Sequence, residues 1–296
     1  MPRHELHESI LDWYARYARD LPWRSADATP WAVMVSEFML QQTPVVRVLP
    51  AYDAWLSRWP TPTALAADAP GEAVRMWGRL GYPRRALRLH AAATACVDRH
   101  GGAVPSSYDE LLALPGVGDY TAAAIASFAF RQRHAVLDTN VRRVLARVVE
   151  GSEYEATQST TAAERGLACE LLPDDGETAA TWSVAVMELG ALVCAARAPR
   201  CNACPVAQLC TWRLKGKPVW HGSPRRGQSY AGTDRQVRGR LLAVLRDAEE
   251  PVRQEDLDSA WPEAAQRARA LDGLVADGLV EPLEGGTYQL PTARPH

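Results

Sequence analysis

Four cysteines lie close together in the sequence, at Cys194, Cys201, Cys204 and Cys210, with the spacing C-x6-C-x2-C-x5-C. Four thiolates in one short segment can complete the coordination of a metal centre, and ligation by thiolates alone favours an iron–sulfur cluster or zinc. Structural zinc usually combines two C-x2-C-type pairs across a longer spacer, whereas this segment has a single such pair. The spacing therefore favours a [4Fe-4S] cluster, with zinc or unligated buried cysteines as alternatives.

Two acidic side chains stand in contexts that suit the cleavage of a glycosidic bond. Glu37 lies within the apolar segment WAVMVSEFMLQQTP, where burial is expected to raise the pKa of its carboxyl group and keep it protonated as a general acid. Asp138 directly precedes a basic helical segment, and Asp138 or Asn140 can cap that helix. Backbone N–H groups bound to Asp138 are expected to lower its pKa and keep it ionised.

A protonated carboxyl group and a carboxylate together form the pair of roles that glycosidases use. The alternatives are a Glu37 that faces solvent and an Asp138 that only caps a helix.

The segment LPGVGDYTAAAI, residues 114–125, has the composition of a tight turn between two helices. Gly116 and Gly118 permit a turn that Cβ atoms would obstruct. The free N–H groups and the positive dipole end of the second helix, which is expected to start near Thr121, suit a DNA phosphate. The segment is therefore interpreted as a helix-hairpin-helix phosphate clamp, with an ordinary helix–helix turn as the alternative.

The surrounding elements are predicted to be almost entirely helical up to residue 215. A linker rich in Gly, Pro, Ser and basic residues is expected at 216–232. Residues 233–296 then fit helices at 235–247, 253–260 and 262–278, followed by two short strands around Gly285 and Gly286, which is typical of a winged-helix module. Before the linker, helical spacing and Pro or Gly stop signals predict helices at 6–17, 31–42, 70–77, 84–100, 108–114, 121–131, 141–150, 162–172 and 179–194.

The bulk composition is that of a globular protein of 296 residues, with 47% apolar residues and a net charge of −2. No segment reaches the roughly 18 apolar residues that a membrane span needs, and the charged N-terminus lacks a signal-peptide core. Clustered cysteines suit a reducing cytoplasm. The two lysines of the chain are Lys215 and Lys217, so no lysine before residue 215 can form a Schiff base.

These segments occur in the order and spacing of the endonuclease III superfamily of helix-hairpin-helix DNA glycosylases, and the chain most resembles its A/G-specific adenine glycosylases, the MutY type. The resemblance covers roughly residues 8–215 and is carried by the cysteine loop and by LPWR (21–24), SEFMLQQT (36–43), LGY (80–82), LPGVG (114–118), LDTNVRRVLAR (137–147) and MELGALVC (187–194). Bifunctional members carry a lysine where this chain has Tyr120. The resemblance therefore implies a monofunctional glycosylase without lysine-based lyase activity.

The resemblance also implies roles for single residues. Glu37 would protonate a flipped-out adenine, and Asp138, with Asn140 beside it, would stabilise the oxocarbenium-like sugar. Gln42 and Tyr82 match positions that wedge the duplex open near the opposing base. Arg24 and Glu188 match residues that line the adenine pocket.

The fold implied is mainly α: a six-helix barrel, residues 23–132, and an iron–sulfur helical module, residues 1–22 and 133–215. The expected partner is double-stranded DNA with adenine opposite 8-oxoguanine or guanine. The protein is expected to be a monomer in the cytoplasm, associated with the nucleoid. One departure from the family pattern concerns residues 233–296, which are expected to form a winged-helix module and do not resemble the family's usual C-terminal domain, a relative of 8-oxo-dGTP hydrolases. The alternatives are a mismatch thymine or uracil glycosylase of the same superfamily and a non-catalytic DNA-binding protein.

Overall fold

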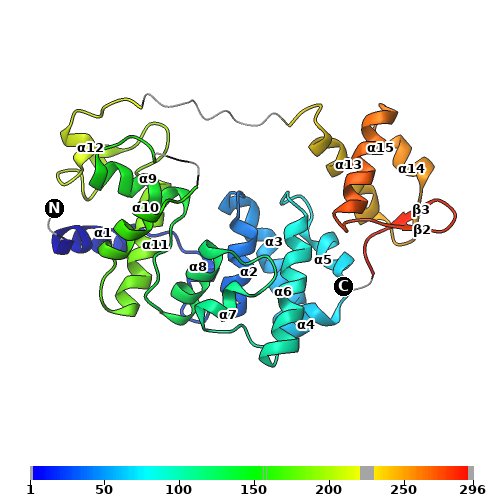
Figure 1. Ribbon diagram of the computed structural model, residues 1–296, viewed down its shortest axis with the longest axis horizontal. Coiled ribbons are helices and arrows are strands. Elements are labelled where there is room, and N and C mark those ends of the chain that lie inside the picture. The colour runs from blue at the N-terminus through cyan, green and yellow to red at the C-terminus, as the bar shows by residue number, and fades with distance from the viewer. Residues whose placement is uncertain (1–2, 156, 158, 221–229, 293–296) are drawn as a thin grey trace. The chain divides into compact units, whose positions relative to one another are not determined.

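The computed structural model describes residues 3–155, 157, 159–220 and 230–292, and most of them lie in helices (Figure 1). The chain forms two compact units and passes between them several times. The first unit comprises Met1–Val33, Ser106–Leu112 and Gly118–Pro224, and the second comprises Met34–Pro105, Ala113–Val117 and Arg225–His296. The division proposed above into residues 1–215, 216–232 and 233–296 stays a prediction. Most of the expected linker, residues 221–229, lies outside the described residues.

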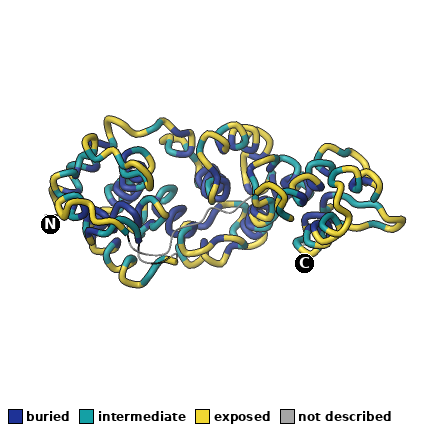
Figure 2. The backbone as a smooth tube through the Cα atoms, turned by 90° about the horizontal axis from the view of Figure 1, so that it is seen from above, coloured by how far each residue is buried: buried dark blue, intermediate teal, exposed yellow. Residues whose placement is uncertain are grey.

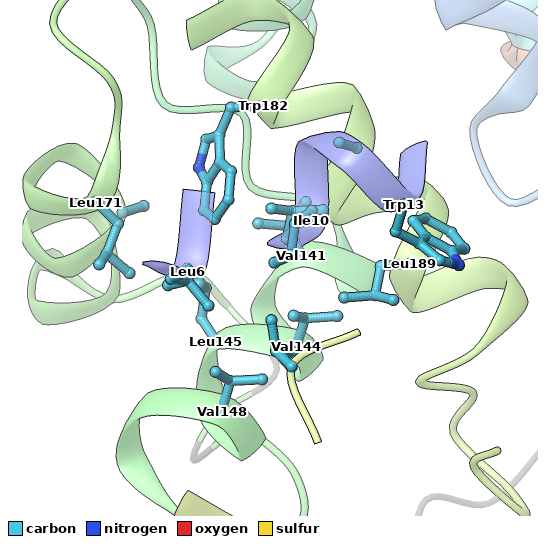
Figure 3. Close-up of a cluster of buried hydrophobic side chains, with 14 of the residues drawn as sticks. Leu6, Ile10, Trp13, Val141, Val144, Leu145, Val148, Leu171, Trp182 and Leu189 are labelled. Carbon is cyan, nitrogen blue, oxygen red and sulfur yellow. The ribbon is translucent and has the colours of Figure 1, made fainter. Parts of the chain in front are cut away.

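The first unit is built on the helices α1 and α11. Leu6, Ile10 and Trp13 of α1 follow helical spacing and are all buried, so α1 presents one apolar stripe to the core. They pack in one cluster with residues of α9 and α11 that include Val141 and Trp182 (Figure 3). The helices of this unit are α1 (Arg3–Tyr17), α7 (Tyr108–Leu112), α8 (Asp119–Phe130), α9 (Thr139–Leu145), α10 (Ala162–Leu171), α11 (Gly176–Leu192) and α12 (Thr211–Leu214).

Short helical turns complete the first unit. A π-helical turn, Ala146–Glu150, continues α9, and two 3-10 turns cover Pro22–Arg24 and Cys201–Ala203. The helix α2 (Pro30–Leu40) begins in the first unit and ends in the second.

The second unit contains α3 (Val45–Arg58), α4 (Pro62–Ala67), α5 (Pro70–Trp77) and α6 (Arg84–His100). Trp55 and Trp77 are fully buried between them and meet edge to face, with ring centroids 5.6 Å apart. Such pairs add to the stability gained from burying apolar area. Each of these helices carries buried residues. Along the chain as a whole, buried and exposed stretches alternate, as expected for amphipathic helices around a core (Figure 2).

Residues 230–292 of the second unit form a small module of three helices and a three-stranded antiparallel sheet. The elements are α13 (Asp234–Asp247), β1 (Val252–Arg253), α14 (Gln254–Ser259), α15 (Ala264–Ala276), β2 (Glu281–Leu283) and β3 (Thr287–Gln289). The strand order is β1-β3-β2, with Val252 and Pro282 both opposite Tyr288. This succession of helix, strand, two helices and hairpin is that of a winged helix. The three helices and the hairpin are as predicted; the strand β1 is an addition.

The structure also corrects several element predictions. The helices α3 and α4 were not predicted, because Pro44 indicated a stop and Pro50 lies inside α3. The helix after Tyr108 ends at Leu112, two residues early, and α8 begins at Asp119 instead of near Thr121. Among the described residues, no helix is long and apolar enough to cross a membrane.

Candidate active site and cysteine cavity

Asp138 is the N-cap of α9. Its Oδ1 accepts a hydrogen bond from the backbone N–H of Val141 at 2.7 Å, and its Oδ2 accepts one from the side-chain amide of Asn140, also at 2.7 Å. The predicted capping role of Asp138 is confirmed, whereas Asn140 lies inside the helix. Both carboxylate oxygens are thus oriented by α9 itself, because the N-cap geometry brings the N–H groups of the first turn to the side chain.

The predicted direction of the Asp138 pKa shift is wrong. Burial raises the pKa of this carboxyl group above its ordinary value, although the hydrogen bonds from Val141 and Asn140 and the charge of Arg143 lower it in part. Desolvation opposes the charged form of any carboxyl group, and here two donors and one nearby cation do not offset it. A raised pKa leaves Asp138 less firmly ionised than the sequence suggested.

Arg143 holds the Asn140 side chain in place, and no sequence pattern identified it. Its Nη2 donates to Asn140 Oδ1 at 2.7 Å and to the Gly190 carbonyl at 2.8 Å, and its Nε donates to the Cys194 carbonyl at 2.8 Å. Gly190 permits this approach, because a Cβ there would lie 2.7 Å from Asn140 Cβ. A chain of hydrogen bonds therefore runs from Asp138 through Asn140 and Arg143 to the first cysteine of the loop.

Glu188 of α11 is fully buried and bound by two arginines. Arg19 donates from Nε at 2.7 Å, from Nη2 at 2.7 Å and from its backbone N–H at 3.0 Å, and Arg24 donates from Nη2 at 2.9 Å. Burial alone would raise the pKa of Glu188, but these hydrogen bonds and the charge of Arg24 lower it to about 2. The structure thus brings the predicted residues Arg24 and Glu188 together, and it adds Arg19, which the sequence analysis missed.

One nitrogen of the Arg24 guanidinium is not used in the contact with Glu188. Its Nη1 is buried and has no hydrogen-bond partner among the residues that the structure describes, and its guanidinium lies 5.9 Å from the centroid of the Tyr14 ring. A buried N–H group without a partner is costly unless a ligand or water satisfies it. This atom is therefore a candidate contact for a polar ligand.

In the second unit, Glu37 lies in α2, is 5% exposed, and shares that helix with buried apolar residues that include Met34 and Phe38. The alternative that Glu37 faces solvent is therefore wrong. The protonated state expected of Glu37 stays a prediction.

Gln42 and Tyr82 share an unusual backbone conformation. Their φ angles are 55° and 47°, in the left-handed region that non-glycine residues rarely adopt. Such strain is held only where the surrounding structure enforces it, and it gathers at functional sites. Tyr82 is 40% exposed on its turn.

Arg85 joins the turns that carry these two residues. It is 5% exposed; its Nη1 donates to the Phe38, Met39 and Gln41 carbonyls at 2.9, 3.0 and 2.6 Å, and its Nη2 to the Gly81 carbonyl at 3.0 Å. Burial lowers the pKa of Arg85 to about 10, so it stays charged at neutral pH. The sequence analysis missed Arg85, which lies in the first turn of α6.

The glycines of the hairpin segment differ in what they require. Gly116 has φ +77°, and a Cβ there would lie 2.6 Å from Arg88 Cβ, so only glycine fits at residue 116. Gly118 caps α8 with φ −108°, and a Cβ there would meet nothing within 4 Å. The steric reason given for Gly118 is therefore wrong, and open space adjoins the α8 N-terminus. Tyr120 lies in the first turn of α8, partly buried against Ala123 and Val136.

All four loop cysteines line one cavity, together with Arg147, Trp212 and Val193. None of the four is in a disulfide. Arg147 is almost fully buried, with its Nη1 3.5 Å from Cys194 Sγ and its guanidinium 4.8 Å from the Trp212 ring centroid. Among the described residues, no group of three or more His, Cys, Asp or Glu side chains is arranged to hold a metal ion. The loop thus forms a thiol-lined cavity with a cation at its edge.

Comparison with known proteins agrees with this geometry. A family model described as "HhH-GPD superfamily base excision DNA repair protein" matches residues 35–167. The chain is 53% identical over 291 residues to the adenine DNA glycosylase of Mycobacterium tuberculosis, covering 98% of this chain and 95% of that protein. A thermostable thymine-DNA glycosylase has a similar structure, with a TM-score of 0.65 at 29% identity, over 72% of this chain and 97% of that one.

A second solved structure shows the same fold. It is a trapped covalent intermediate of endonuclease III with DNA, with a TM-score of 0.61 at 21% identity, over 74% of this chain and all of that one. The helical architecture, the two carboxylates in their predicted elements and a match over nearly the whole length lead to one conclusion. The chain belongs to the HhH-GPD superfamily of base excision DNA repair proteins, among the adenine DNA glycosylases.

Proposed function

We propose that this protein is a monofunctional glycosylase that excises adenine mispaired with 8-oxoguanine or guanine in double-stranded DNA. The observation that carries this proposal is the oriented Asp138 carboxylate, which α9 and Asn140 hold at both oxygens. A carboxylate fixed in this way can stabilise positive charge on a sugar without having to reorganise during the reaction. Capping of α9 needs only the bond from Val141, whereas the bond from Asn140 orients the second oxygen as well.

The two carboxyl groups take different steps. Glu37 donates its proton to a ring nitrogen of the extruded adenine, and the electron pair of the glycosidic bond leaves with the base. Asp138 stabilises the cationic sugar that remains until water adds to its anomeric carbon and loses a proton. The environment of each group suits its step, since Glu37 lies among apolar side chains and Asp138 accepts two hydrogen bonds.

The absence of a lyase step follows from the side chain at residue 120. A Schiff base with the abasic sugar requires an amine, and Tyr120 offers a phenol instead. The chain has no lysine before residue 215 to take its place.

The cysteine cavity is proposed to hold a [4Fe-4S] cluster. Four thiolates are a suitable ligand set for such a cluster, and a cavity with a cation at its edge suits a group whose core and thiolates together are anionic. When bound, the cluster would tie the loop to the end of α11. The residues that hold it would be Cys194, Cys201, Cys204 and Cys210.

Binding to DNA is expected to use the open N-terminus of α8 as a phosphate contact, since Gly118 leaves space there. We further propose that the protein acts as a monomer in the cytoplasm, in association with the nucleoid. A basic surface is not needed overall, because a net charge of −2 still permits basic groups to gather on one face.

The test is single-turnover excision from duplexes with adenine opposite 8-oxoguanine, guanine or cytosine, and with thymine or uracil opposite guanine. We expect excision of adenine opposite 8-oxoguanine and guanine, with no strand cleavage until alkali is added. Glu37→Gln and Asp138→Asn should each abolish excision while duplex binding persists. Glu170→Gln, an exposed carboxylate on α10, is the matched control. Release of thymine or uracil in preference to adenine would overturn the proposal.

A further inference from the structure

The winged-helix-like module contacts α5 of the second unit through its backbone and arginines. Arg246 Nε donates to the Val74 carbonyl at 2.9 Å, and Arg75 Nη1 donates in return to the carbonyls of Arg246 and of Ala248, the latter at 2.9 Å. Gly71 N–H donates to the Pro291 carbonyl at 2.7 Å. These bonds come from the C-terminal end of α13 and from Pro291 near the end of the module, so the module is an integral part of this unit.

Gly71 is needed for this contact. A Cβ at this residue would lie 2.6 Å from the Pro291 oxygen and 2.8 Å from Leu290 Cβ. Only glycine lets the two backbones approach so closely. A sequence chosen only for the helix α5 would have no reason to place glycine in its first turn, where it weakens the helix.

The contact brings a basic residue of α13 over the exposed ring of Tyr82. The guanidinium carbon of Arg235 lies 4.3 Å from the Tyr82 ring centroid, and that of Arg85 lies 5.6 Å from it. A guanidinium within about 6 Å of an aromatic centroid is attracted by the ring. Arg84, beside this turn, pairs with Asp277 of the module at 3.2 Å, which adds a second link at the same place.

This arrangement is unlike that of a core aromatic. Tyr82 is 40% exposed and is held in a left-handed conformation, and Arg235 itself is exposed. An exposed ring on a strained turn offers a stacking surface to a nucleobase, and an exposed guanidinium next to it offers a contact to the neighbouring phosphate. Ordering a flexible tyrosine ring on a base costs conformational entropy. The guanidinium reduces this cost because it holds the ring in place before DNA binds.

We propose that Arg235 is a positioning residue for Tyr82, so that the C-terminal module helps Tyr82 to stack on a base that stays in the duplex beside the mispair. The module would thereby contribute to the choice of the base opposite adenine. This inference rests on the proposed function, since it concerns recognition of the mispaired duplex at the same reaction.

The experiment is a double-mutant cycle in the full-length holoprotein with Arg235→Ala, Tyr82→Ala and the double variant. Arg240→Ala is the matched control, because Arg240 is an exposed arginine on the same helix and its loss changes the net charge equally. Duplex dissociation constants and single-turnover rates are measured for adenine opposite 8-oxoguanine and opposite guanine. The fluorescence of a 2-aminopurine placed beside the opposing base reports how far that base step is unstacked.

We expect Arg235→Ala to weaken binding of the 8-oxoguanine duplex about two- to fivefold and to bring the dissociation constants for the two mispairs closer together. The double variant should bind less weakly than the product of the two single effects predicts, since loss of Tyr82 already removes the ring that Arg235 positions. The 2-aminopurine signal should fall in both single variants and stay unchanged in Arg240→Ala. Arg235→Lys, which keeps the charge but not the planar group, should restore part of the affinity without restoring the signal.

Two results would overturn the inference: an Arg235→Ala protein indistinguishable from Arg240→Ala, or effects of the two single changes that simply multiply. Failure of the proposed function gives a different result, in which the wild-type protein excises no adenine from either mispair. The binding cycle and the fluorescence still report on Arg235 in that case, so the two failures are separable.

Discussion

The ionised, fully buried Glu188 and its bonds to Arg19 and Arg24 should make one of the largest electrostatic contributions to the stability of the first unit. The pKa of Glu188 is lowered from 4.5 to about 2, and its side chain has no exposed surface. A difference of about 2.5 pKa units at about 1.4 kcal/mol per unit corresponds to roughly 3–4 kcal/mol in favour of the ionised form at neutral pH. Glu188→Gln keeps the volume and removes the charge, so the loss should be of this order.

A second estimate agrees with this magnitude. Removing one partner of a buried ion pair costs about 3–5 kcal/mol, because the remaining charges stay buried without compensation. In Glu188→Gln the uncompensated groups would be Arg19, which is about one-third exposed, and Arg24, which is 16% exposed. For a chain of this size, about 3 kcal/mol corresponds to a decrease of roughly 6–12 °C in Tm.

The assay is thermal and urea unfolding of the holoprotein, followed by circular dichroism, with Glu177→Gln as the control. Glu177 is an exposed carboxylate of the same helix, 3.6 Å from Arg131, and its loss should cost less than about 0.5 kcal/mol. A Glu188→Gln protein within about 1 kcal/mol of the wild type would refute the reasoning.

The pH dependence provides an independent check, because its sign follows from the lowered pKa. The folded protein holds Glu188 ionised at pH values where the unfolded chain has begun to bind a proton. The stability advantage of the wild type over Glu188→Gln should therefore be constant well above pH 4.5 and should shrink as the pH falls from about 4.5 towards about 2. An advantage that grew as the pH fell through this range would contradict the assignment.

Two further predictions concern the active site and the cofactor. The pKa of Asp138 is raised and its proposed role requires the carboxylate, so the excision rate should fall as the pH drops through that raised pKa. Asn140→Ala removes a hydrogen bond that lowers this pKa and should therefore shift the acidic side of the pH–rate profile to higher pH. A profile that does not move would argue against the proposed role. Iron and acid-labile sulfide should be present in equal amounts in the purified protein. Both should be lost in Cys204→Ser and retained in Cys169→Ser, because Cys169 is exposed and lies outside the cavity. Iron retained in Cys204→Ser would exclude Cys204 as a ligand.

Local patterns in the sequence were sufficient for most helices. The helices α1, α6 and α11 have apolar residues at helical spacing and clear stop signals, and they form close to the predicted bounds. The helix α3 was missed because Pro44 and Pro50 both indicate interruption, although Pro44 is in fact the N-cap and Pro50 is accommodated inside the helix. Tertiary packing of Trp55 and its neighbours decides here against local propensity.

The residues that orient the candidate site were beyond the reach of sequence patterns. Arg85 bonds to carbonyls of residues 38–41, and Arg143 bonds to residues 190 and 194. An arginine that binds backbone carbonyls distant in the chain leaves no spacing that a sequence pattern can detect, because the acceptor exists at every residue. Motifs led to the groups that are proposed to take part in chemistry, whereas the side chains that hold them became visible only in three dimensions.

Glu188 and Asp138 illustrate why the chemical state of a carboxyl group is harder to predict than its identity. Both lie in the first unit, both are removed from water to a large extent, and burial opposes ionisation in both. Glu188 gains enough from Arg19 and Arg24 for its pKa to fall to about 2, whereas Asp138 has two neutral donors and a cation that acts mainly through Asn140, so its pKa rises. The difference suits the role proposed for Asp138. A carboxylate already saturated by guanidinium groups could stabilise a cationic sugar only by breaking those bonds, whereas one that is incompletely compensated gains stability when positive charge develops beside it.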